Sequence, residues 1–212
     1  MDTTEKWVTT TGALVAAIED QSIGRVVVSG RLIDAPSLRL SPGRSLCGTG
    51  EDVAVVFMAG AEGVQLSSDN SLCNLHLCSD PAKRAIFNDT TVSTLGRLEL
   101  SGVRTTGRVQ ILARGEVCAG HVEVDGLDIV AADARLEHER PHGYGVHVLQ
   151  GAFTLWNMQP DERATISANL VRISVGREGA PVGGSGVFVT VRSEAGVGDR
   201  CDARCQHCTQ YQ

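Results

Sequence analysis

Short runs of alternating apolar and polar residues recur along the chain, and most contain a single polar residue between two aliphatic ones. Alternation of this kind over three to five residues is typical of a short β-strand with one buried face. In one series of such runs the central residues are separated by 23, 24, 24 and 25 positions; they are His76, Glu99, Glu123, His147 and Arg172. We therefore expect a structural unit of about 24 residues that repeats along the chain.

Two further series run through the same part of the chain with similar periods. One contains Arg39, Gln65, Ile86 and Gln110, and the other contains Cys47, Cys73, Leu95 and Cys118. A glycine follows several of the strands at a nearly constant offset, as at Gly102, Gly126 and Gly151, where the chain must bend sharply. Three strands per period predict a coil with three faces.

A parallel β-helix accounts for this pattern better than other solenoids do. No segment after residue 20 has the i, i+3, i+4 spacing of a helical repeat, and the fixed leucine frame of leucine-rich repeats is absent. Aromatic residues make up only 4% of the chain, which suits a narrow interior filled by small aliphatic side chains. The predicted fold is therefore all-β, a single-stranded parallel β-helix.

The two ends of the chain differ from the repeat. Thr10 can cap a short amphipathic helix that contains Leu14 and Ile18, so residues 1–24 are expected to cap the first coil. Coils are expected over 25–189. The alternation fades in 190–212, which is polar and rich in cysteine; we expect an irregular tail there, and a truncation or a shifted reading frame is one explanation for it.

On this coil pattern, over roughly residues 25–189, the chain resembles the right-handed parallel β-helix proteins of the pectate-lyase-like superfamily. The resemblance implies a right-handed coil and a polysaccharide or oligosaccharide as the ligand. It rests on the repeat alone, because neither the Trp-Ile-Asp-His motif of pectate lyases nor the Gly-His-Gly motif of polygalacturonase-like hydrolases occurs here. No catalytic residue is carried over from the family.

The outward residues of the 24-residue series are the first candidates for chemistry. Stacked coils would place Glu99, Glu123 and His147 about 4.8 Å apart, with His76 and Arg172 at the two ends of the row. Two carboxylates at that distance either share a proton or bind a cation, and the flanking histidines suit acid–base catalysis or metal binding. We name Glu99, Glu123 and His147 as candidate catalytic residues and His76 and Arg172 as candidate substrate-binding residues. The alternative is a solvated sheet face of mixed charge.

The longest polar excursion, 131–144, is the second candidate. Long loops on a rigid solenoid often form a wall of a binding groove. This loop offers charge pairing, a proton carrier and an aromatic surface for an acidic sugar through Arg135, Arg140, His142 and Tyr144. An ordinary hydrophilic loop is the alternative.

The cysteines form two groups. Cys47, Cys73, Cys78 and Cys118 lie in or beside apolar runs and are expected to be free thiols that pack as small hydrophobic residues. The tail contains three cysteines at a spacing seen in metal-binding loops, which makes them weak candidates for a metal site: Cys201, Cys205 and Cys208. No motif in the sequence calls for an organic cofactor, so we expect none.

The composition of the chain excludes some classes of function. The net charge of −6, from 19 basic and 25 acidic residues, argues against a protein that neutralises nucleic-acid phosphates. The apolar runs are too short to span a membrane. No secretory signal is recognised at residue 1, so a cytoplasmic setting with reduced thiols is the default expectation. The sequence leaves three functions open: a binding or structural β-helix, a polysaccharide lyase or hydrolase, and a metal-binding protein.

Overall fold

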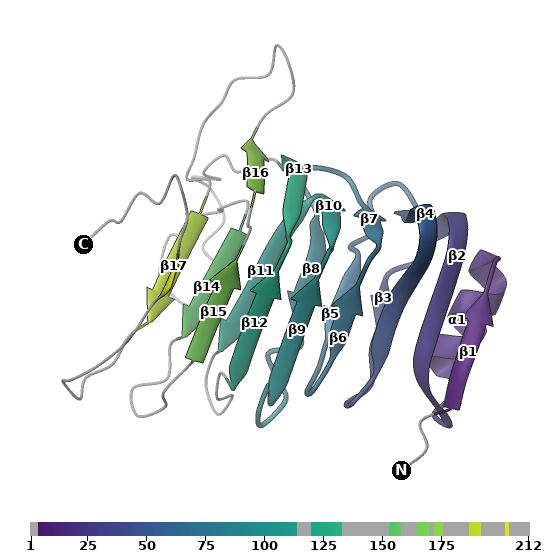
Figure 1. Ribbon diagram of the computed structural model, residues 1–212, viewed down its shortest axis with the longest axis horizontal. Helices are drawn as coiled ribbons and strands as arrows, with labels where there is room; N and C mark the ends of the chain where they lie inside the picture. Colours follow the sequence, from purple (N-terminus) through teal and green to yellow (C-terminus); the bar gives the residue numbers. More distant parts are fainter. Residues whose placement is uncertain are drawn as a thin grey trace.

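The structure, a computed structural model, is a parallel β-solenoid whose strands lie side by side along one axis (Figure 1). It describes residues 4–113, 120–132, 153–157, 165–169, 172–175, 187–191 and 202–203. Within these residues every strand pair is parallel, and the inner strands of each sheet pair with their counterparts on the coils before and after them. The predicted β-helix fold with a repeat of about 24 residues is confirmed.

Each coil has three faces, which we name by the strands that build them. The first face contains β1 (Thr4–Val8), β2 (Ile23–Ala35), β4 (Ser45–Phe57), β6 (Ser71–Cys73), β9 (Arg97–Ser101), β12 (His121–Asp125), β15 (Thr165–Asn169) and β18 (Asp202–Ala203). The second face contains the later halves of β2 and β4, then β7 (His76–Cys78), β10 (Arg104–Thr106), β13 (Asp128–Ala132) and β16 (Arg172–Val175). The third face contains β3 (Leu38–Arg39), β5 (Val64–Leu66), β8 (Arg84–Asn88), β11 (Arg108–Ala113), β14 (Phe153–Asn157) and β17 (Val187–Val191).

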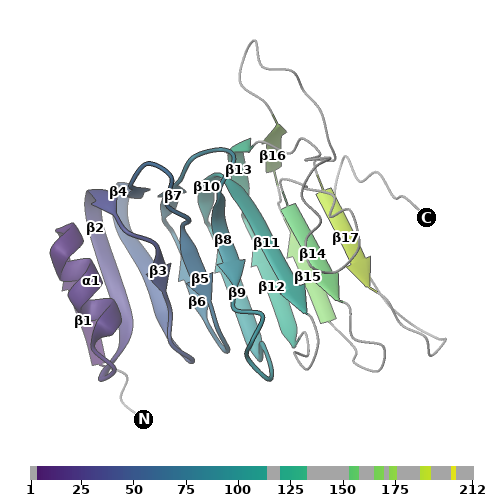
Figure 2. The same ribbon diagram turned by 180° about the vertical axis from the view of Figure 1, so that it is seen from behind.

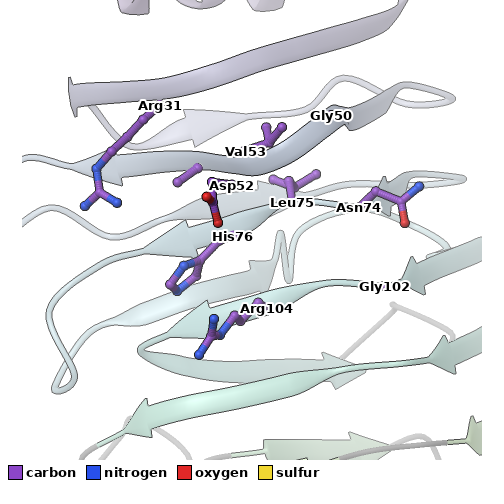
Figure 3. Close-up of a pocket in the computed structure, with 10 residues that line it drawn as sticks. Arg31, Gly50, Asp52, Val53, Asn74, Leu75, His76, Gly102 and Arg104 are labelled. Carbon is purple, nitrogen blue, oxygen red and sulfur yellow. The ribbon is translucent and has the colours of Figure 1, made fainter.

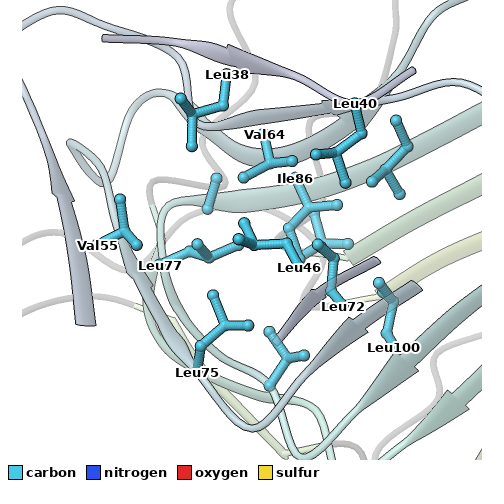
Figure 4. Packing of buried hydrophobic residues seen from close by; sticks show 14 of the residues in the cluster. Leu38, Leu40, Leu46, Val55, Val64, Leu72, Leu75, Leu77, Ile86 and Leu100 are labelled. Carbon is cyan, nitrogen blue, oxygen red and sulfur yellow. The ribbon is translucent and has the colours of Figure 1, made fainter. Parts of the chain in front are cut away.

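Aliphatic side chains from all three faces meet inside the coil (Figure 4). On the first face Leu46, Leu72 and Leu100 occupy equivalent positions on successive coils, and all three are buried. On the third face Val64 lies opposite Ile86 in the same way. Each side chain therefore packs on its counterpart one strand spacing away, about 4.8 Å, and the result is a continuous apolar column along the axis.

The predicted N-terminal helix is present as α1 (Thr11–Glu19), which lies beside β1 and β2 at the first end of the solenoid (Figure 2). Thr10 is its N-cap, and its Oγ1 accepts a hydrogen bond from the Ala13 N–H at 3.2 Å. At the other end, the buried Arg44 guanidinium donates to the backbone carbonyls of Ala17 and Ile18. A cation at the carboxyl end of a helix satisfies carbonyls that lack partners within the helix. Arg44 thus fastens the helix to the coil below it.

The two further series predicted from the sequence are correct at their beginnings and wrong later. Arg39 lies opposite Gln65, as predicted, but Gln65 lies opposite Phe87 and not Ile86. Gln65 faces outward, whereas Ile86 is fully buried and belongs to the inner column, so the two cannot share a row. Leu95 is likewise buried, and the residue opposite Cys73 is Ser101.

The expectation of free thiols is wrong for two cysteines. Cys47 and Cys73 occupy equivalent positions on β4 and β6, their Cα atoms are 4.5 Å apart, and their sulfurs form a disulfide. The parallel register brings them together, since cysteines at matching positions on neighbouring coils face the same side of the sheet. Cys78 is a free thiol, and Cys118 lies outside the described residues.

The predicted division into 1–24, 25–189 and 190–212 stays a prediction. Of the expected irregular tail, 190–212, the structure describes Thr190 and Val191, which end β17, and β18, which pairs with β15 on the first face. The three tail cysteines lie outside the described residues.

Candidate functional site

The predicted pair of glutamates is present on the outer side of the first face. Glu99 on β9 lies directly opposite Glu123 on β12. Arg97 bridges them: its Nε lies 2.5 Å from Glu99 Oε1 and its Nη2 lies 2.7 Å from Glu123 Oε2. His121 Nε2 lies 3.6 Å from the same Glu123 oxygen. Of the two arrangements considered for such a pair, a shared proton or a bound cation, the structure has the second, and the cation is a guanidinium of this chain.

The other neighbours of the glutamate pair are not the histidines that the sequence spacing predicted. Ser71, and not His76, lies opposite Glu99, and Ser167 occupies the position opposite Glu123 that the spacing predicted for His147. Ser167 comes 44 positions after Glu123 (167 − 123), so the matching strand lies further along the chain than a period of 24 residues predicts. His147 itself lies outside the described residues.

His76 and Arg172 do share a row, but it runs along the second face. Successive pairings join Arg31, Ala54, His76, Arg104, Asp128 and Arg172. His76 and the glutamates belong to different faces because the bend after Cys73 separates β6 from β7. The side chain of Arg172 and the loop residues Arg135, Arg140, His142 and Tyr144 lie outside the described residues.

A groove of about 520 Å³ opens on the outer side of this second face (Figure 3). Arg31 from β2, His76 from β7 and Arg104 from β10 project along it, and Asp52 from β4 lies among them. Ala54 occupies the position between Arg31 and His76 in the row. Because its side chain is a single methyl group, the row is hollow at that point.

One end of the groove is formed by the bends that precede these strands. Asp52 and Asn74 have positive φ angles of 53° each, a conformation that aspartate and asparagine tolerate better than other non-glycine residues. Gly50 and Gly102 line the same end, also with positive φ. The Asn74 amide lies over Gly102, where any Cβ would meet its Oδ1 at 2.6 Å. Glycine at 102 is therefore required by both the backbone and the neighbouring side chain.

The two arginines of the groove differ in whether an anionic side chain is paired with them. Asp128 Oδ2 lies 3.6 Å from Arg104 Nε, so this arginine already has an anionic neighbour. The side chain of Arg31 forms no hydrogen bond or ion pair to another described residue, and neither does the side chain of Asp52. Arg31 is exposed, so its guanidinium has all its donors available to a ligand.

His76 is half-buried between these charges, and its Nε2 lies 3.3 Å from the Thr106 hydroxyl oxygen. Burial lowers the pKa of His76 below 6.5, and the positive charges of Arg104 and Arg31 lower it further, while Asp128 acts in the opposite direction. Cys78 lies two residues further along the same strand and faces the same side. Burial raises the pKa of the Cys78 thiol, so it is not an activated nucleophile.

Sequence reasoning found His76 but missed Arg31 and Arg104, the two cations beside it. Arg104 comes two residues after the glycine that follows a predicted strand, which was the available signal. Arg31 gives no such signal, because it lies within a long strand that continues from the first face to the second.

Within the described ranges no group of three or more His, Cys, Asp or Glu side chains is arranged to hold a metal ion. Over the same part of the chain, no helix has the length and apolar character needed to cross a membrane. Comparison with protein-family models, with curated proteins and with solved structures finds no match to this chain.

Proposed function

We propose that this protein is a binding β-solenoid that recognises an acidic oligosaccharide or polysaccharide in the groove of the second face. The observation that carries the proposal is the row Arg31, Ala54, His76 and Arg104, in which cationic or protonatable side chains surround a hollow of about 520 Å³.

The charges of the groove favour an anionic ligand. Arg31 has no anionic partner among the described residues, and a guanidinium binds carboxylates through paired hydrogen bonds. Asp52 and Asn74 add an acceptor and an amide at the rim of the groove, which suit the hydroxyl groups of a sugar.

The arrangement supports binding better than catalysis. The Cys78 thiol is not activated, and the carboxylates of Glu99 and Glu123 are occupied by Arg97 on another face. A general acid or base needs a pKa near the working pH, which neighbouring groups usually provide. The carboxylate in the groove, Asp52, has no described side-chain partner that would shift its pKa in this way.

The test is binding of oligogalacturonate, with neutral cello-oligosaccharide as the comparison ligand, measured by calorimetry. Arg31→Gln is expected to weaken oligogalacturonate binding at least tenfold, because it removes a charge-assisted contact. Arg97→Gln is the matched control, since it removes an exposed arginine from the first face of the same sheet. Equal loss in both variants, or no preference for the acidic ligand, would refute the proposal.

The enzyme hypothesis is examined on the same samples. If Glu99, Glu123 and His147 catalyse cleavage of the polysaccharide, Glu123→Gln and His147→Ala abolish product formation. An unsaturated product then identifies a lyase and a new reducing end identifies a hydrolase. Absence of product from the unmodified protein supports the binding proposal.

A further inference from the structure

His76 is surrounded by groups from every neighbouring strand of the second face. Arg31 on β2 and Arg104 on β10 are cationic. On β4 the neighbour in the row is Ala54, and the Asp52 carboxylate lies among these groups in the groove (Figure 3). Thr106 on β10 contacts the ring, and Cys78 lies beside it on β7. Asp128 on β13 is one strand further away and is paired with Arg104.

We propose that anion binding in this groove is coupled to uptake of a proton by His76, so that the groove binds its ligand more tightly at mildly acidic pH than at neutral pH. The inference rests on the proposed function in one respect: the ligand is taken to be an anion. It adds a regulatory property that the binding proposal does not require.

The charges around His76 favour its neutral form when no ligand is bound. Without ligand, His76 lies in a row between Arg31 and Arg104, and Asp128, the carboxylate that favours its protonated form, is already paired with Arg104. A third positive charge on His76 is therefore unfavourable, in agreement with the lowered pKa of the imidazole. An anion above Ala54 would lie between Arg31 and His76 and would compensate both.

The direction in which affinity changes with pH follows from thermodynamic linkage. Because the anion stabilises the protonated ring, the pKa of His76 is higher in the complex than in the free protein. Between these two pKa values the complex holds more protons than the free protein, so affinity rises as pH falls. A difference of one pKa unit corresponds to about a tenfold change in Kd.

The experiment measures binding of oligogalacturonate and of inorganic sulfate between pH 5.5 and 7.5. Both probes keep their charge over this range, so the protein alone supplies any proton linkage. Calorimetry in two buffers with different ionisation enthalpies gives the number of protons taken up. The expected result is proton uptake of up to one per complex and a Kd that increases several-fold from pH 5.5 to 7.5.

His76→Gln is expected to bind more weakly with a Kd that does not vary with pH. His76→Asn serves as a second variant, and circular dichroism checks that each is folded. The control is His121→Gln, which changes a histidine on the first face and should retain the full pH dependence. Binding that does not vary with pH, or a pH dependence that persists without His76, would overturn this inference and leave the proposed function standing. Absence of binding to either probe at every pH would overturn both.

Discussion

His76 is a half-buried imidazole whose environment favours its neutral form. Burial of the ring and the two nearby arginines both lower its pKa. The described hydrogen-bond partner of the ring is the Thr106 hydroxyl. In the unfolded chain the same side chain is solvated and titrates near its ordinary pKa of about 6.5. The difference between the two states makes this residue a contributor to acid sensitivity of the fold.

Folding stability is predicted to fall below about pH 6.5 in part because of His76. Since its folded-state pKa is lowered, the unfolded chain binds more protons in this window, and the free energy of unfolding decreases as pH falls. Above this window the ring is neutral in both states and contributes no pH dependence. Urea unfolding at pH 5, 6 and 7.5 should show that His76→Gln loses less stability on acidification than the unmodified protein. Parallel curves for the two proteins would contradict this.

At the scale of elements, the junction between β4 and β6 fixes the relation between the first and second faces. The Cys47–Cys73 disulfide joins the two strands, and the residues that follow it, Gly48 and Asn74, are packed closely against each other. Asn74 then lines the groove. The junction therefore determines where the second face begins on these two coils.

Replacing Gly48 with alanine is predicted to destabilise the protein by about 1–3 kcal/mol, because the new Cβ would overlap the backbone carbonyl of Asn74. The matched substitution is Gly12→Ala in α1, where a Cβ meets nothing within 4 Å. It should stabilise the protein by about 0.5–1 kcal/mol, since alanine has the higher helix propensity. Thermal unfolding of both variants checks this pair, and a neutral Gly48→Ala would show that the junction can relax.

Loss of the Cys47–Cys73 disulfide is predicted to lower the free energy of unfolding by about 3 kcal/mol. The bond closes a loop with a sequence separation of 26 residues, and its removal lets the unfolded chain regain that freedom. Denaturant unfolding of Cys47→Ser/Cys73→Ser measures the change. Cys78→Ser is the control, because this thiol forms no disulfide. An equal effect of reductant on the double variant and on the unmodified protein would argue against this bond as the cause.

At the scale of the whole molecule, stability depends on the apolar column that runs through the coils. Solenoid coils contact mainly their neighbours, so each buried side chain supports the coils directly before and after it. Leu72 is fully buried between Leu46 and Leu100, whereas Ile33 on β2 is 59% exposed. The two residues have similar size and opposite environments.

Leu72→Ala is predicted to cost about 2–5 kcal/mol, because it leaves a cavity that the stacked coils cannot fill completely. Ile33→Ala, as the comparison, should change the free energy of unfolding by no more than about 0.5 kcal/mol. Chemical denaturation of both variants provides the measurement. A small effect at Leu72 would mean that the column is loosely packed.

Which residues of a strand face inward and which face outward can be read from the amino-acid sequence alone. Leu98 and Leu100 are buried and Glu99 points outward because side chains alternate with a period of two, a property of the local backbone. The same alternation, with a separation of 24 residues, placed Glu99 opposite Glu123. The N-terminal helix also followed from local signals, since its cap and apolar positions lie within a few residues.

Which strands pair across neighbouring coils, in contrast, follows from the folded arrangement and not from local sequence. That register depends on how many residues each bend absorbs, and coil lengths vary, so Ser71 and not His76 lies beside Glu99. The Cys47–Cys73 disulfide and the Arg97 bridge arise from this register. So does the groove, because Arg31, His76 and Arg104 are far apart in the sequence and meet only when successive coils stack on the second face.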